Sequence, residues 1–127
     1  EEESVPPGFG PTQGNAVLDG AFTTYPWMKL HIGQPGAAGT SNPAGETTRV
    51  DTTGKMAAAA AGSKASNAAL DWTAVSTSET YTHCSFWTLA VGGTFGMSGT
   101  VTANPISSGD NFQIPSGQLV ASVNLAS

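Results

Sequence analysis

Residues 81–93 read YTHCSFWTLAVGG, and this is the longest β-strand signal in the chain. The odd-numbered side chains from Tyr81 to Val91 would share one face and the even-numbered ones the other, because side chains alternate along a strand. The pair Gly92-Gly93 predicts a two-residue hairpin turn, since glycine tolerates the positive φ that such turns need. The chain would then return through residues 94–102. We therefore expect an antiparallel hairpin at the centre of the fold.

Shorter strand signals lie on both sides of this hairpin. In residues 27–32, Met28, Leu30 and Ile32 alternate with other side chains and predict a strand with these three facing inward. Further strands are predicted at residues 47–51, 55–60, 65–72, 112–114 and 118–125. The alanines at 57–61 suit a helix by propensity, but their Gly-, Ser- and Thr-rich surroundings favour a strand. About eight short strands with regularly spaced turns predict an all-β fold, a single-domain antiparallel β-sandwich of jelly-roll type.

The first residues differ in character from the rest. Residues 1–14 have no periodicity, begin with three glutamates and contain three prolines, so we expect an extended N-terminal arm that contacts a neighbouring molecule. Asn15 can cap a short helix, which Gly20 would limit. Residues 15–127 would form the sandwich domain. A chain of 127 residues is long enough for one core without a disulfide or a metal.

The charge balance excludes several classes of partner. The chain has 4 Lys and Arg against 9 Asp and Glu, a net charge of -5. It therefore lacks the basic surface that nucleic acids and anionic membranes require, and no apolar run is long enough to span a bilayer. The single cysteine, Cys84, lies within the central strand and is expected to be a buried, unreactive thiol.

No set of residues predicts catalysis, a metal, a cofactor or a small-molecule substrate. His31 and His83 belong to separate predicted strands, and no His-x-His spacing pairs them. Asp71 and Asp110 could face each other as a carboxylate pair, but each lies beside a turn, where Asp commonly caps backbone amides. We therefore expect a protein that is not an enzyme.

The longest loop is the main candidate for an interaction surface. Residues 34–46 read QPGAAGTSNPAGE, with almost no large apolar side chain, so the loop should lie on the surface, either mobile or ordered by a partner. Arg49 at its end should pair with Glu46 or with a carboxylate of a neighbouring subunit. Trp27 could pack in the core or anchor an interface. The predicted interface residues are Val5, Pro6, Pro7, Phe9, Trp27, Gln34, Pro35, Asn42 and Arg49.

Several segments together resemble a known family. The strand that ends in Leu-His-x-Gly-x-Pro-Gly at residues 30–36, the loop, and Thr-Thr-Arg at 47–49 are followed by the segments at 82–87, 95–99 and 108–117. In this order and spacing they resemble small virion structural proteins of tailed bacteriophages, especially actinobacteriophages. Those proteins are described as capsid decoration, minor tail or tail-fibre proteins. One departure is Thr88, which follows Trp87 where the family usually has Asp.

The resemblance implies a virion protein and leaves its place in the virion open. A compact β core, an arm, a long loop and an acidic exterior favour a capsid decoration or cement protein, or minor capsid protein, on the outer face of the capsid. Its partners would be the major capsid protein, copies of itself, or both, as a homo-oligomer. The alternatives are a minor tail or tail-fibre subunit, and a β-sandwich module that binds a carbohydrate or a receptor.

Overall fold

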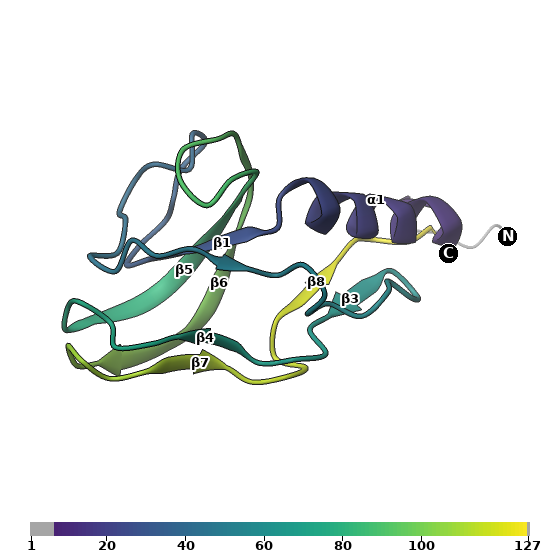
Figure 1. Ribbon diagram of the computed structural model, residues 1–127. Coiled ribbons are helices and arrows are strands. Elements are labelled where there is room, and N and C mark those ends of the chain that lie inside the picture. The colour runs from purple at the N-terminus through teal and green to yellow at the C-terminus, as the bar shows by residue number, and fades with distance from the viewer. Residues whose placement is uncertain (1–6, 127) are drawn as a thin grey trace, which may run out of the picture.

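The computed structural model describes residues 7–126, which form one helix and eight strands (Figure 1). The elements are α1 (Pro11–Thr24), β1 (Trp27–His31), β2 (Val50–Asp51), β3 (Ser63–Ala65), β4 (Leu70–Trp72), β5 (Glu79–Trp87), β6 (Phe95–Ile106), β7 (Phe112–Ile114) and β8 (Val120–Ser122). The strands form antiparallel sheets, and within these residues no sheet closes into a barrel. The predicted antiparallel β-rich fold is confirmed, with one helix in addition, and the sandwich or jelly-roll arrangement stays a prediction.

The predicted central hairpin is confirmed as β5 and β6 in a four-stranded sheet of order β2-β1-β5-β6. Trp27 of β1 lies opposite Trp87 of β5, and His31 lies opposite His83. The turn is longer than predicted, because β5 ends at Trp87 and residues 88–94 connect it to β6. The pairing of β5 with β6 is irregular in two places, one of them near Tyr81, so the two faces of β5 do not follow the simple odd–even alternation.

The core lies between this sheet and the β4–β7 pair (Figure 1). Phe112 of β7 packs against Tyr81 of β5, with ring centroids 4.9 Å apart, and against Trp72 of β4 at 5.7 Å. Met28 and Leu30 are fully buried, as predicted, and so is Cys84. Burial raises the pKa of the Cys84 thiol to about 12, which keeps it protonated and unreactive at neutral pH.

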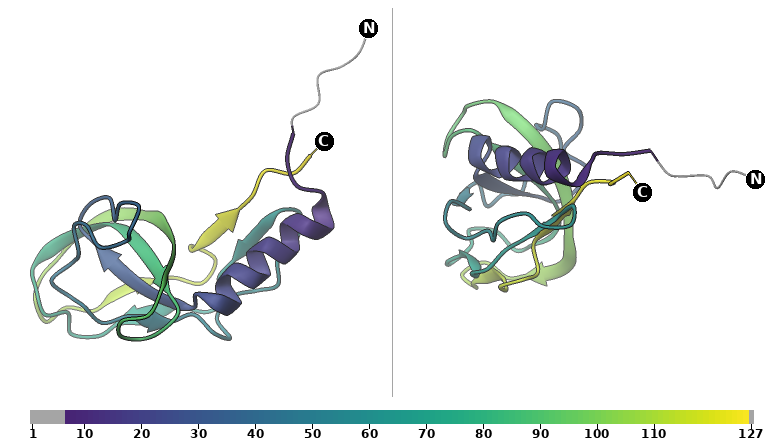
Figure 2. Two further views of the ribbon diagram at one scale, coloured as in Figure 1. Left: turned by 90° about the horizontal axis from the view of Figure 1, so that it is seen from above. Right: turned by 90° about the vertical axis from the view of Figure 1, so that its right-hand side faces the viewer.

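Helix α1 corrects the prediction of an extended arm up to residue 14. Pro11 begins the helix, at a position where its missing N–H is not needed, and the helix continues through Gly20 to Thr24. Its buried Phe22 meets Phe86 of β5 edge to face, with centroids 5.2 Å apart. In Figure 2, α1 runs beside β3 and β8, which pair with each other. The first six residues of the predicted arm lie outside the described residues.

Two other segments differ from their predicted structure. The alanines at 57–61 form neither helix nor strand, and Lys64 explains part of this. Its ammonium donates hydrogen bonds to the carbonyl of Ala57 at 2.9 Å and to the carboxylate of Asp19 on α1 at 2.7 Å. That carboxylate also accepts the N–H of Ala59, and both interactions lower the pKa of Asp19. Ile32, predicted to face inward, is 47% exposed because β1 ends at His31.

Candidate functional site

The outer face of the four-stranded sheet is covered by the long loop, here called the covering loop (residues 32–49). The N–H of Ile32 donates to the carbonyl of Asn42 at 3.0 Å, which closes the loop at its base. Pro35 and Gly39 are buried, and a Cβ at Gly39 would overlap the ring of Phe95 on β6. The loop therefore packs against its own chain, and a role for it as an interaction surface stays a prediction.

A series of hydrogen bonds connects this loop to the sheet beneath it. Nδ1 of His31 donates to the carbonyl of Ser41 at 2.9 Å, which leaves Nε2 to accept the hydroxyl of Ser85 at 2.7 Å. The indole N–H of Trp87 donates to the same Ser85 oxygen at 2.7 Å. His31 and Ser85 are completely buried, so no substrate can reach this serine–histidine pair. The arrangement fastens the loop and is not a catalytic dyad.

His31 predicts acid sensitivity of the folded chain. Burial is the main cause that lowers its pKa, and the positive charge of Lys29 acts in the same direction. Below about pH 6.5 the unfolded chain therefore binds a proton that the folded chain excludes. We expect the free energy of unfolding to fall, by at most about 1.4 kcal/mol per pH unit, from pH 6.5 down to the lowered pKa.

Urea unfolding at a series of pH values measures this effect. His31→Gln should unfold with a flatter pH profile in this range, because the titrating group is gone. An unchanged slope in His31→Gln would contradict the assignment.

Arg49 has a different partner from the one predicted. Its guanidinium lies 4.5 Å from the centroid of the Trp87 ring and donates 2.7 Å hydrogen bonds to the carbonyls of Leu89 and Gly92. The predicted pairing with Glu46 does not occur, because that carboxylate instead accepts the backbone N–H of Ser76 at 2.9 Å. Arg49 therefore supports the connection between β5 and β6.

That connection, residues 88–94, is here called the tip, and it projects beside the covering loop (Figure 1). Leu89 is 55% exposed and Val91 is 84% exposed. The alternation of residues 81–91 predicts both in the central strand, but β5 ends at Trp87 and both lie in the connection. Its only signal in the sequence is the apolar Leu-Ala-Val run immediately before two glycines. The tip therefore leaves two large apolar side chains in water.

A groove lies between β6 and β7, on another part of the surface. It has a volume of about 580 Å³, within the range of roughly 300–1,000 Å³ that is usual for clefts that bind ligands or side chains. Val101, Phe112, Ile114 and Pro115 supply apolar lining, and Gln113 supplies an amide. No charged residue lines the groove. The sequence analysis did not single out any of these residues as a site.

The predicted interface residues do not form one surface. Gln34 and Asn42 are exposed and joined by a 3.0 Å hydrogen bond from the Asn42 amide to the Gln34 carbonyl, while Pro35 beside them is buried. Trp27 is half-buried, so a place in the core and a role as an interface anchor both stay open.

Pro7 and Phe9 lie in a separate region, where the N–H of Phe9 donates to the carbonyl of Asn124 at 2.9 Å. Val5 and Pro6 lie outside the described residues. A shared interface role for the predicted residues stays a prediction.

The described residues contain neither a metal cluster nor a membrane-spanning helix. Within residues 7–126, no three His, Cys, Asp or Glu side chains come together to hold a metal ion. In the same part of the chain, α1 is too short and too polar to cross a membrane. Trp72 and Trp87 are buried and Trp27 is half-buried, so the carbohydrate hypothesis has no exposed tryptophan platform among these residues.

Comparison with known proteins gives a family match that covers most of the chain. The model of the family described as podophage GP4 fiber I protein gp80 matches residues 12–122. None of the curated proteins matches the chain. The matched region runs from the first turn of α1 to the end of β8, and so includes the covering loop, the tip and the groove.

Proposed function

The chain belongs to the family of the podophage GP4 fiber I protein gp80, and on that premise we propose that it is a tail-fibre subunit of a podophage virion. Membership confirms the resemblance to phage virion structural proteins and implies a structural rather than an enzymatic protein. The family is one of fibre proteins and not of capsid decoration proteins, so the alternative from the sequence analysis replaces its main hypothesis.

The surface of the molecule supports this proposal. The serine–histidine pair described above is sealed under the covering loop, whereas the apolar tip and the uncharged groove are open to solvent. Such features suit contact with other protein chains. Other fibre chains or copies of this chain are therefore the proposed partners, in place of the major capsid protein.

Gold-labelled antibodies against this chain, applied to purified virions, test the proposal by electron microscopy. We expect gold particles at the tail fibres. Labelling spread evenly over the capsid surface would overturn the proposed function and restore the decoration hypothesis. Virions treated with gold-labelled antibodies against the major capsid protein provide the control for capsid labelling.

A further inference from the structure

The tip is held in shape before it meets any partner. Arg49 binds the carbonyls of Leu89 and Gly92, and the N–H of Thr94 donates to the hydroxyl of Thr88 at 2.9 Å. Binding through the tip therefore immobilises little that is not already ordered. Its two large apolar side chains, those of Leu89 and Val91, are left in water in the isolated chain.

The groove has an apolar, uncharged lining against which such side chains could pack away from water. Its lining includes the apolar side chains of Val101, Phe112 and Ile114, and it carries no charge that an apolar side chain would have to desolvate. A volume of about 580 Å³ accommodates a few side chains of the size of leucine and valine.

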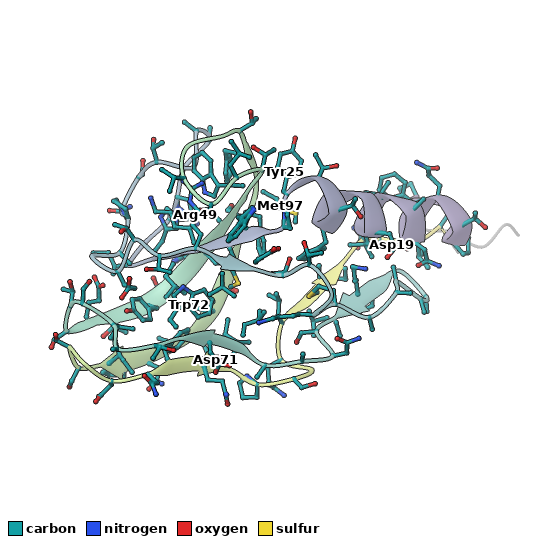
Figure 3. All side chains as sticks on the ribbon, in the orientation of Figure 1. Asp19, Tyr25, Arg49, Asp71, Trp72 and Met97 are labelled. Atoms are coloured by element: carbon teal, nitrogen blue, oxygen red, sulfur yellow. The ribbon has the colours of Figure 1, made fainter. Side chains whose placement is uncertain are left out.

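Basic residues outnumber acidic ones beside the tip, where Lys29 and Arg49 lie with Asp51, whereas a carboxylate lies beside the groove. Lys29 lies close enough to Arg49 for the two charges to repel, so half of the four basic residues lie near the tip. At the groove, the carboxylate of Asp71 accepts a 2.7 Å hydrogen bond from the amide of the lining residue Gln113. Figure 3 shows Arg49 near the top of the molecule and Asp71 at the bottom. Contact between two tips would bring like charges together, whereas contact of a tip with a groove brings opposite charges together.

We propose that copies of this chain associate head to tail, with the tip of one copy seated in the groove of the next. This inference rests on the proposed function, because it names the partner through which a fibre subunit would assemble. A head-to-tail contact uses two different surfaces of each copy, so it can repeat into an open chain or close into a ring.

Sedimentation velocity of the full chain at increasing concentration tests the inference. We expect the wild-type chain to form species larger than a monomer. Val91→Asp places a charge on the tip, and Ala103→Trp fills the groove that Ala103 lines. Each variant should weaken self-association at least about tenfold, because each removes one of the two surfaces. Val120→Asp is the matched control, since Val120 is 55% exposed on β8 and belongs to neither surface, and it should associate like the wild type.

A mixture of the two variants distinguishes this arrangement from a symmetric dimer. Val91→Asp retains an intact groove, and Ala103→Trp retains an intact tip. Mixed, they should form a one-to-one complex that stops at two chains, although each alone stays monomeric. Both substitutions are at exposed positions, so we expect both variants to fold. Urea unfolding of each variant checks this.

Three results would overturn the inference: a wild-type chain that stays monomeric throughout, self-association that Val91→Asp leaves intact, or a mixture that forms no complex. Gold labelling of the fibres together with a monomeric wild-type chain would remove only the head-to-tail contact. Gold labelling of the capsid would instead contradict the proposed function, whichever oligomeric state sedimentation velocity shows.

Discussion

Trp87→Ala should lower the free energy of unfolding by about 3–5 kcal/mol, the range for removal of a large buried aromatic side chain. The Trp87 ring lies between the guanidinium of Arg49 and the ring of Phe95, whose centroid is 5.5 Å away. The indole N–H also donates a hydrogen bond to the hydroxyl oxygen of Ser85, which is completely buried. The substitution would leave a cavity beneath the covering loop and release Arg49 from the face of the ring. Urea denaturation monitored by circular dichroism measures the change.

Trp87→Phe is the control for the packing of this ring. It keeps an aromatic face beneath Arg49 but removes the N–H that donates to Ser85, so we expect a smaller loss of about 1–2 kcal/mol. A loss below about 1 kcal/mol for Trp87→Ala would show that the ring is not part of a packed layer, since exposed positions give changes of that size.

Gly39→Ala should destabilise the chain by about 3 kcal/mol, for two reasons that add. Gly39 has a φ of +73°, which an alanine adopts only with strain, and the new methyl group would overlap the ring of Phe95. Gly117→Ala is the matched control, because Gly117 has a φ of +85° and open space where its Cβ would lie. It should show the backbone strain alone, about 1 kcal/mol.

The difference between the two variants measures how firmly the covering loop packs on the sheet. Thermal unfolding of both proteins in the same buffer provides the comparison. If both substitutions have equal effects, the loop does not rest on Phe95, and the description of the outer face is wrong.

The parts of the fold that could be predicted are those that depend on local alternation. Strands β1, β5 and β7 and the hairpin follow from side chains that alternate along the sequence. Only part of helix α1 could be found in this way, because Pro11 and Gly14 have the appearance of helix breakers and Gly20 limits the short helix predicted from Asn15. Pro11 begins the helix, and Gly14 is buried where a Cβ would meet the side chain of Leu125, more than a hundred residues away.

The site was harder to predict because its contacts join distant segments. The buried position of His31 depends on Ser85, 54 residues later, and the partners of Arg49 are carbonyls 40 and 43 residues away. Local sequence offered Glu46 as a nearer partner for Arg49, but that carboxylate is engaged by backbone N–H groups. Composition did indicate a structural protein, which family membership supports.

The copy number of the chain in purified virions tests the central claim most directly. Quantitative mass spectrometry against the major capsid protein gives this ratio, with labelled peptides of both proteins as standards. A tail-fibre subunit should be present in few copies for each particle, far below the major capsid protein. A count in the hundreds, near that of the capsid subunits, would contradict the account and identify a protein of the capsid surface.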